Sequence, residues 1–334
     1  MSLWWYTALP TNTPDFKMSP TFTVDPKTLT NLRNKTIVIT GGSSGIGLAT
    51  AILISDISST NNIAILDLHP PPPSLSIPQS RLLYKQCDIT SWPSQRSAFQ
   101  AVIDKFQKID AVFVCAGISE YKDQIFTDEV DGEGLLKEPD RRVYRVDLDA
   151  ATDSVKLAIY WMRRNGVDGG VIVMAASLAG YLGSAGAPLY SAAKHGIVGL
   201  LRSLKQETAT LNIAISLIAP GITLTPILAV NREEEGSGAF SMDEWAKDMG
   251  SRGVPINTPE SIASAVAYLI NGGMSSNGKG MLIQNDRIGE LESGIAKGRS
   301  QWMGAEMLKL FRGGRNAPLF SRVGAGSEGK SSKL

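Results

Sequence analysis

A glycine-rich loop between a strand pattern and a helical pattern is the feature that most constrains the fold of this chain. The loop, Thr40-Gly41-Gly42-Ser43-Ser44-Gly45-Ile46-Gly47, follows the β-branched run 36–40 and precedes the apolar-periodic run 48–54. Glycines let a pyrophosphate approach the backbone closely, and the first turn of the next helix offers free N–H groups. We therefore expect a nucleotide cofactor to bind through Gly41, Ser44, Gly45, Ile46 and Gly47. An ordinary glycine-rich turn is the alternative.

Short apolar runs alternate with amphipathic runs along most of the chain. Strands are expected at 36–40, 63–68, 81–86, 111–115, 170–174, 213–218 and 280–284, and helices at 45–56, 94–107, 140–165, 190–209 and 259–270. Apolar strands separated by helices predict parallel strands that are covered on both faces. We expect one α/β domain built on a doubly wound sheet, with ligands bound at the carboxyl ends of its strands.

Ser177, Tyr190 and Lys194 lie downstream of the loop in the stretch MAASLAGYLGSAGAPLYSAAKHG. Tyr190 and Lys194 are four residues apart, so in a helix they share one face. A neighbouring ammonium favours the phenolate form of a tyrosine, which can take a proton from an alcohol or return one to a carbonyl. Ser177 ends an apolar run and is a candidate to hold the substrate oxygen. A helix N-terminus with an incidental Tyr and Lys is the alternative.

Together these segments resemble the short-chain dehydrogenase/reductase family. The matching residues are TGGSSGIG at 40–47, Asp67, Asp88, CAG at 115–117, Ser177, Tyr190, Lys194, PG at 220–221 and Thr225-Pro226, and the resemblance covers roughly residues 33–290. It implies a Rossmann-type fold and an oxidoreductase that interconverts a secondary alcohol and a ketone. The extension and the segment 222–257 are similar to fungal secondary-metabolite and prostaglandin-dehydrogenase-like members, which implies a bulky lipophilic or polyketide-like substrate.

The resemblance also implies a role for each matching residue. Tyr190 is expected to be the acid/base, Lys194 to assist it and to hold the nicotinamide ribose, and Ser177 to orient the substrate oxygen. On the cofactor, Asp88 is expected at the adenine, Cys115 and Gly117 along the adenosine side, Pro220 and Gly221 at the end of a strand, and Thr225 at the carboxamide. Cys115 stands where the family usually has Asn, which removes an amide that braces the sheet.

Asp67 predicts the choice of cofactor. It lies at the end of the second expected strand, where a carboxylate accepts hydrogen bonds from the adenosine ribose and repels a 2′-phosphate. No Arg occurs at 42–47 or 67–73 to bind such a phosphate. We therefore expect NAD rather than NADP. A strand-end Asp that caps a turn is the alternative.

Asp147 departs from the family pattern, which usually has Asn at this position. The Asn holds a water between the catalytic Lys and solvent, whereas an ionised Asp near Lys194 would pair with the ammonium. Such pairing would raise the pKa of Lys194 and partly cancel its field at Tyr190. Either the proton relay from the catalytic Lys through this water to solvent works with a carboxylate in place of the Asn, or the pH optimum of activity moves to higher pH. A surface-facing Asp is the remaining alternative.

Composition excludes several classes of protein. Of the 334 residues, 43% are hydrophobic and 19% are charged, which favours a sizeable core over global disorder. The net charge of +1 argues against a dedicated nucleic-acid surface, and no apolar run has the length of a membrane span. Cys87 and Cys115 are expected to be free thiols, and with two His no metal-ligand cluster is expected.

The chain divides into four expected regions. They are an irregular N-terminal arm (1–32), a Rossmann-fold domain (33–290), an extension helix (291–320) and a mobile tail (321–334). Within the domain, 222–257 is expected to be a mobile segment that covers the substrate. Within the extension, 302–311 is amphipathic with a helical period.

The tail ends in Ser332-Lys333-Leu334, a tripeptide that a peroxisomal import receptor reads. The polar residues before it are expected to keep it accessible. The expected location is therefore the peroxisome, with the cytoplasm as the alternative. The N-terminal MSLWWYTALP lacks a basic region and does not read as a secretory signal.

Three functions remain open at this point. The first is an NAD-dependent oxidoreductase acting on a lipophilic or polyketide-like secondary alcohol or ketone. The second is a peroxisomal 3-hydroxyacyl-CoA dehydrogenase of β-oxidation, for which Arg141 and Arg142 are candidates to bind the phosphates. The third is a non-redox cyclase or ligand-binding scaffold on the same fold, against which Ser177, Tyr190 and Lys194 argue. The resemblance further implies a homodimer or homotetramer built on the helices at 140–165 and 190–209.

Overall fold

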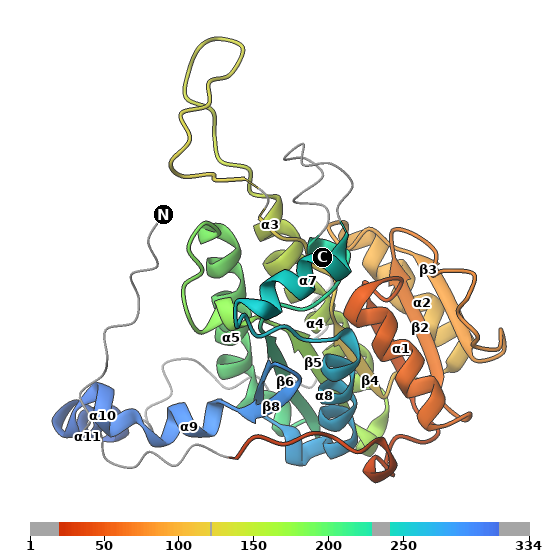
Figure 1. Ribbon diagram of the computed structural model, residues 1–334. Helices are drawn as coiled ribbons and strands as arrows, with labels where there is room; N and C mark the ends of the chain where they lie inside the picture. Colours follow the sequence, from red (N-terminus) through yellow and green to blue (C-terminus); the bar gives the residue numbers. More distant parts are fainter. Residues whose placement is uncertain (1–19, 121, 229–240, 314–334) are drawn as a thin grey trace, which may run out of the picture.

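A single sheet of eight strands forms the centre of the protein (Figure 1). The computed structural model describes residues 20–120, 122–228 and 241–313. The strands are β1 (Thr36–Thr40), β2 (Asn62–Asp67), β3 (Leu82–Gln86), β4 (Ala111–Val114), β5 (Gly170–Ala175), β6 (Ile213–Pro220), β7 (Gly280–Gln284) and β8 (Arg287–Glu290). Their order is β3-β2-β1-β4-β5-β6-β7-β8, and every neighbouring pair is parallel except β7 with β8. The expected doubly wound parallel sheet is confirmed.

Helices cover both faces of the sheet. The longer ones are α1 (Gly45–Ile57), α2 (Trp92–Phe106), α4 (Ala150–Met162), α5 (Pro188–Ala209), α7 (Met242–Ser251) and α8 (Pro259–Gly272), and α4 is preceded by α3 (Arg142–Tyr144) and the π-helical turn η2 (Arg145–Asp149). The 3-10 turns are η1 (Pro26–Thr28), η3 (Gly166–Asp168), η4 (Leu178–Gly180) and η5 (Gly273–Ser276). Residues of α1 and α8 pack on one face, and residues of α2, α4 and α5 pack on the other.

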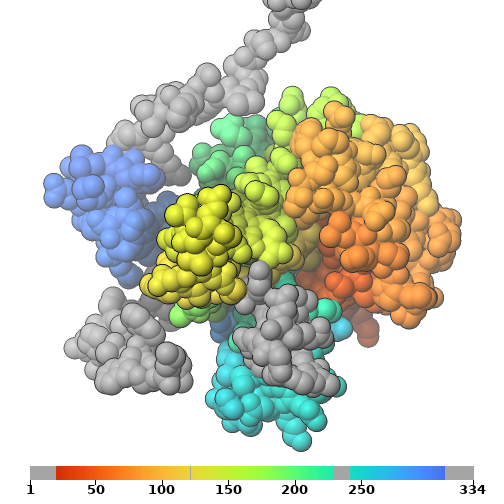
Figure 2. All heavy atoms as spheres, turned by 90° about the horizontal axis from the view of Figure 1, so that it is seen from above, coloured from red at the N-terminus to blue at the C-terminus, as the bar shows by residue number. Residues whose placement is uncertain are grey.

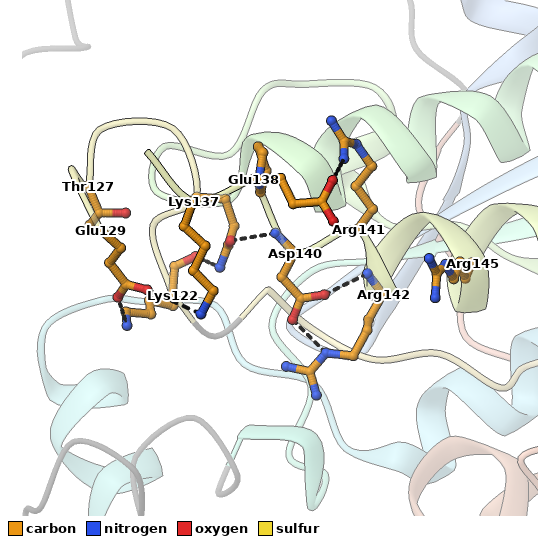
Figure 3. A pocket seen from close by; sticks show the side chains of 11 residues that line it. Lys122, Thr127, Glu129, Lys137, Glu138, Asp140, Arg141, Arg142 and Arg145 are labelled. Atoms are coloured by element: carbon orange, nitrogen blue, oxygen red, sulfur yellow. Dashed lines mark hydrogen bonds and ion pairs between the residues drawn. The ribbon is translucent and has the colours of Figure 1, made fainter. Parts of the chain in front are cut away.

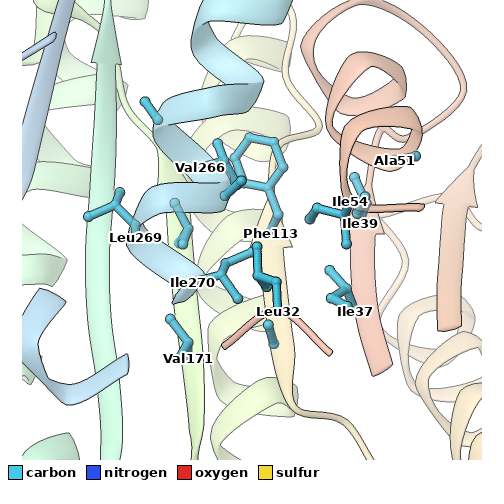
Figure 4. Close-up of a cluster of buried hydrophobic side chains, with 14 of the residues drawn as sticks. Leu32, Ile37, Ile39, Ala51, Ile54, Phe113, Val171, Val266, Leu269 and Ile270 are labelled. Atoms are coloured by element: carbon cyan, nitrogen blue, oxygen red, sulfur yellow. The ribbon is translucent and has the colours of Figure 1, made fainter. Parts of the chain in front are cut away.

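The period of the strands divides the core into two layers. In β1, Ile37 and Ile39 face the layer under α1 and α8, whereas Val38 between them faces the layer under α4 and α5. Successive side chains of a strand point to opposite faces, so an all-apolar strand fills both layers. Phe113 of β4 and Val266 of α8 meet in the first layer (Figure 4). Burying one such side chain contributes about 1.5–3 kcal/mol to stability.

The chain reverses its winding direction between β1 and β4. From β1 it proceeds outward to β2 and β3, then returns across the sheet to β4, which pairs with the other side of β1. The loops that leave β1 and β4 therefore separate at the same edge of the sheet. Crevices at such a switch point are where open α/β sheets bind ligands.

Two elements of the described chain were not expected from periodicity, although short motifs signal both. β8 is an antiparallel edge strand joined to β7 by Asn285-Asp286, which both have positive φ, and such residue pairs favour two-residue hairpins. In α7, the Ser241 side chain accepts a hydrogen bond from the Glu244 N–H. Ser followed by Glu three residues later is a capping-box pattern. α7 lies in the predicted mobile segment 222–257, of which 229–240 falls outside the described residues.

The described chain begins with a segment that packs against the domain and ends in short helices beyond β8. In the expected N-terminal arm, Phe22 and Ile288 exchange backbone hydrogen bonds of 2.9 and 3.0 Å, and Leu29 and Leu32 are buried. The expected extension helix is three short helices, α9 (Glu292–Lys297), α10 (Arg299–Met303) and α11 (Ala305–Gly313). Gly304, with a φ of +75°, separates the last two. Residues 1–19 and the predicted tail, 321–334, lie outside the described part.

Candidate active site

The loops at the switch point enclose a groove of about 300 Å³. Its lining comprises Gly41, Ser44, Gly45, Ile46, Gly47, Leu66, Asp67, Leu68, Cys87, Asp88, Ile89, Thr90, Cys115, Ala116, Gly117, Ile118, Val146, Thr225, Pro226 and Ile227. The structure therefore brings together the glycine loop, both strand-end aspartates, the CAG segment and Thr225, as the sequence predicted. The neighbouring apolar residues of the lining, such as Ile118 and Val146, carry no motif and were not expected from the sequence.

The glycines of the loop are required by close backbone approach. A Cβ on Gly41, whose φ is +67°, would lie 2.7 Å from the Ala116 Cα, and a Cβ on Gly47 would lie 2.1 Å from the Gly41 carbonyl oxygen. A side chain at Gly41 would force the β1 and β4 loops apart, and one at Gly47 would collide with the backbone of the glycine loop itself. The loop then leads directly into the N-terminus of α1, where Ser44 is the N-cap and makes no side-chain capping bond. Free N–H groups at a helix N-terminus suit a pyrophosphate, so these residues fit a dinucleotide.

Two carboxylates line the adenosine end of the groove. Asp67 is half-buried and accepts hydrogen bonds from the backbone N–H groups of Ser43 (3.0 Å) and His69 (3.2 Å). Asp88 accepts from the Thr90 N–H and hydroxyl. Within the described lining there is no Lys or Arg. The charged side chains of the described lining are therefore both carboxylates.

The helix α5 presents Tyr190 and Lys194 on one face. Pro188 stands in its first turn, where a proline needs no hydrogen bond from its nitrogen. The Lys194 Nζ lies 5.5 Å from the centre of the Tyr190 ring. Tyr190 is half-buried, and among the residues that the structure describes no group is bonded to its hydroxyl. The phenol is therefore available to a substrate.

Lys194 and Asp147 form a buried ion pair. Their Nζ and Oδ2 atoms are 3.0 Å apart, and Nζ also donates to the carbonyl of Ala175 at 3.0 Å. Burial lowers the pKa of Lys194, but the charges of Asp147 and Tyr190 and the bond to Asp147 outweigh it, so the pKa is raised. The pairing expected from the sequence is therefore present. The third proton of the ammonium remains available for a ligand.

A π-helical turn places Asp147 in the interior. The sequence predicted one continuous helix over 140–165, but η2 widens the helix just before α4 and carries Asp147, which is 1% exposed. Its Oδ1 accepts the Ile118 N–H at 2.8 Å. A Cβ on Gly117 would lie 3.3 Å from Asp147 and 3.5 Å from the Lys194 ammonium. The carboxylate thus links the β4 loop of the groove to α5.

The remaining predicted residues surround this centre. The Ser177 hydroxyl accepts the Ala179 N–H at 3.1 Å and makes only a long contact of 3.5 Å with the Pro220 carbonyl, so its proton can serve another acceptor. Gly221 follows Pro220 at the end of β6. Thr225 is buried, and its side chain packs on Gly45 of the glycine loop.

Cys115 stands where the family usually has an Asn that braces the sheet, and here Thr40 makes the bracing bonds instead. The buried Thr40 hydroxyl accepts the N–H groups of Cys115 (3.0 Å) and Ala116 (3.2 Å), which ties the end of β4 to β1. Burial raises the pKa of the Cys115 thiol to about 12, against a smaller opposing effect of Lys194. Burial also raises the pKa of the Cys87 thiol. Both cysteines are free thiols, as expected.

Glu120 is a site residue that the sequence analysis missed. Its side chain is 9% exposed, and Oε2 accepts the backbone N–H of Tyr190 at 2.9 Å. The N-cap of α5, Ala187, has no side chain that could bond this N–H. Glu120 therefore does from the β4 loop what an N-cap does in other helices. Its distance of 70 residues along the chain left no local signal for this contact.

The chain is similar to several known dehydrogenases. The family model described as short chain dehydrogenase matches residues 35–236. "Short-chain dehydrogenase/reductase ATR7" of Stachybotrys chlorohalonatus is 31% identical over 87% of this chain and 92% of its own length. "5'-hydroxyaverantin dehydrogenase" of Dothistroma septosporum is 26% identical over 86% and 96%. "3-Hydroxyacyl-CoA dehydrogenase type-2" of Bos taurus is 34% identical over 57% and 74%.

The fold also matches solved structures. The ligand-free aldohexose dehydrogenase of Thermoplasma acidophilum superposes with a TM-score of 0.64 at 24% identity, over 76% of this chain and 93% of that protein. Among the described helices, none combines the length and hydropathy needed to span a bilayer. The same part of the chain holds no group of three or more His, Cys, Asp or Glu side chains placed to bind a metal.

Proposed function

Because the chain belongs to the short-chain dehydrogenase family and is therefore an oxidoreductase, we propose that it interconverts a secondary alcohol and a ketone with NAD. The observation that carries this proposal is the placement of Lys194 and Asp147 beside Gly117, which lines the glycine-loop groove, with the Tyr190 ring 5.5 Å from the Lys194 Nζ. A phenol with a free hydroxyl and a buried ammonium are the groups that proton transfer at an alcohol requires.

In the oxidation direction, the Tyr190 phenolate takes the proton of the substrate hydroxyl. The Lys194 ammonium stabilises the phenolate, and the Ser177 hydroxyl donates a hydrogen bond to the substrate oxygen. When bound, NAD supplies the acceptor for the hydride that leaves the carbinol carbon. Loss of the proton and the hydride converts the alcohol to a ketone, and reduction reverses both transfers.

The choice of NAD rests on Asp67. Its carboxylate occupies the adenosine end of the groove, and the described lining there carries no cation that would bind a 2′-phosphate. Asp88, Cys115, Gly117, Pro220, Gly221 and Thr225 complete the proposed cofactor contacts. The third N–H of Lys194 is assigned to the nicotinamide ribose.

The proposed substrate is a lipophilic or polyketide-like alcohol or ketone. The name of the hydroxyaverantin dehydrogenase supports an alcohol of this kind. A second candidate, a 3-hydroxyacyl-CoA, is favoured by the name of the Bos taurus relative and by the arginines at 141, 142 and 145, which line a cavity at the same edge of the sheet. We further propose a homodimer or homotetramer built on α4 and α5.

Replacement of Tyr190 tests the chemistry. In Tyr190→Phe, turnover should fall by about 10²- to 10⁴-fold because the transferable proton is gone, while NADH binding, followed by its fluorescence, should stay near the wild-type value. Tyr160→Phe on the exposed side of α4 is the matched control. Turnover by Tyr190→Phe within about tenfold of the wild type would remove this residue from the mechanism. The substrates should be a panel of secondary alcohols that includes a 3-hydroxyacyl-CoA, each with NAD and with NADP.

The proposed location is the peroxisome. The support is Ser332-Lys333-Leu334, which lies outside the described residues. A fluorescent protein fused before residue 1 should give peroxisomal puncta, and deletion of the tripeptide should make the signal diffuse. A diffuse signal from the intact fusion would exclude an import address.

A further inference from the structure

A charged cavity of about 410 Å³ lies at the base of the segment that projects between β4 and α3 (Figure 3). We call it the arginine pocket. Its lining comprises Lys122, Gln124, Thr127, Glu129, Lys137, Glu138, Pro139, Asp140, Arg141, Arg142 and Arg145. In Figure 1 the projecting segment stands above α3, and in Figure 2 it is the yellow group between the blue C-terminal helices and the orange half of the molecule. The pocket therefore lies on the same side of the molecule as the groove, since η2 contributes to both linings.

The lining of the arginine pocket carries both signs of charge with an excess of cations. Five of its side chains are cationic and three are carboxylates, whereas the net charge of all 334 residues is only +1. An excess of positive charge in a concave surface attracts ligands of negative charge. The volume lies in the range of small-molecule sites rather than of a bare ion.

Most of the cations already have carboxylate partners. Arg141 pairs with Glu138 at 3.1 Å, Arg142 pairs with Asp140, and Lys122 pairs with Glu129. Within the described part of the chain, Arg145 makes no ion pair, and no dashed line reaches it in Figure 3. Its charge acts on Asp140, where burial raises the pKa but hydrogen bonds and charge from Arg142, together with the charge of Arg145, outweigh it and lower the pKa. These pairs partly neutralise the other cations, and Arg145 leaves a guanidinium fork available to a ligand.

Arg145 is joined to the active site by the backbone itself. Three successive residues of η2 reach three sites: Arg145 lines the arginine pocket, Val146 lines the cofactor groove, and Asp147 binds Lys194. Successive Cα atoms are about 3.8 Å apart. The linings of the arginine pocket and of the groove therefore contain consecutive residues of η2, Arg145 and Val146. The other end of the projecting segment is also anchored here, through Glu120 and the Tyr190 N–H.

We propose that the arginine pocket binds a phosphate-bearing tail of the substrate, with Arg145 as its principal ligand. The inference rests on the proposed function, because it assigns the tail to the same molecule whose alcohol or ketone meets Tyr190. A guanidinium binds phosphate through two parallel N–H bonds. The substrate is then a lipophilic acyl group carried on a phosphorylated thioester carrier, and the carrier gives binding energy without entering the reaction.

Two thioesters with the same ketone test the proposal. Acetoacetyl-CoA carries the phosphates, and acetoacetyl-N-acetylcysteamine lacks them. The ratio of their kcat/KM values should fall by about tenfold or more in Arg145→Gln, since a hydrogen bond to a charged group contributes about 1.5–3 kcal/mol. The control is Arg163→Gln, an exposed arginine at the C-terminal end of α4, roughly 25 Å away along the helix axis. Its ratio should match the wild type.

Calorimetry with free CoA separates this inference from the proposed reaction. CoA should bind the full-length protein. Arg145→Gln should weaken this binding by the same factor of about ten that is expected for the kcat/KM ratio, whether or not acetoacetyl-CoA is reduced. Binding without turnover would count against the proposed reaction only. No binding of CoA at 1 mM, or an unchanged ratio in Arg145→Gln, would overturn the inference. If both thioesters were used equally and ADP bound as tightly as CoA, the arginine pocket would be a site for free nucleotides. That result would also overturn the inference.

Discussion

The Lys194 ammonium lies 3.0 Å from the Asp147 carboxylate, and both side chains are buried. Each oxygen of Asp147 has its own partner, because Oδ1 accepts the Ile118 N–H while Oδ2 faces the ammonium. An asparagine at this position has one oxygen and can satisfy only one of the two partners. The carboxylate is therefore held between the β4 loop and α5 by both contacts.

Asp147→Asn should move the acid limb of the kcat/KM profile to lower pH, because the ammonium then acts on the phenol alone. Activity near neutral pH in the oxidation direction should rise. The measurement is a pH–rate profile of both proteins with the same alcohol. An unchanged profile would show that the ion pair has no effect on the base, and a collapse of activity would make the carboxylate an active part of the relay.

The same variant should change the dependence of stability on pH. The folded pKa of Lys194 is raised, so the stabilisation from the pair is complete below the ordinary lysine pKa and is lost as pH rises through the folded value. Wild-type unfolding free energy, measured with urea, should therefore fall above about pH 10. Asp147→Asn should lose stability already near neutrality, by about 3 kcal/mol, since it leaves a buried ammonium unpaired.

Glu120→Ala should lower kcat about tenfold while NADH binding stays near the wild-type value. The substitution removes the acceptor for the Tyr190 N–H, and losing a cap of this kind costs about 1 kcal/mol of stability. The first turn of α5 then holds the Tyr190 phenol less well in the position that catalysis needs, which lowers kcat. Glu120→Gln keeps an oxygen that can accept the bond and should restore most of the activity. If Gln were as inactive as Ala, the negative charge rather than the hydrogen bond would be responsible.

Asp67→Ser combined with Leu68→Arg should shift the preference from NAD toward NADP. The change removes a carboxylate that repels the 2′-phosphate and places a guanidinium at Leu68, which lines the groove and is 52% exposed. Leu68→Arg alone is the control, because it keeps the bonds from Ser43 and His69 to Asp67. A wild-type protein that already prefers NADPH would contradict the role given to Asp67.

Both cysteines should resist alkylation in the folded protein. Burial raises the pKa of Cys115 to about 12 and also raises the pKa of Cys87, so both remain protonated thiols at pH 8. Iodoacetamide should label neither within the time that labels glutathione completely, and it should label both in urea. Mass spectrometry would identify each adduct. Rapid labelling of native Cys115 would show that its sulfur is open to solvent.

The sequence by itself determined the fold class and the main site residues, because both depend on local pattern. Alternating apolar runs specify β1 and its neighbours, and the spacing of Gly41, Gly45 and Gly47 specifies a tight turn whatever surrounds it. Tyr190 and Lys194 are paired by the pitch of one helix. Their roles in catalysis stay predictions, as does the division of the chain into four regions.

The tertiary structure decided between a buried, paired Asp147 and a surface-facing one, and it alone revealed the contact of Glu120 with the Tyr190 N–H. Asp147 and Lys194, and likewise Glu120 and Tyr190, are far apart in the chain and come together through the packing of η2 and the β4 loop against α5. Sequence pattern reports the face of one element, whereas burial and pairing depend on the element packed against it. The π-helical turn that carries Asp147 inward, and the position of Arg145 one residue from the groove lining, follow from that packing.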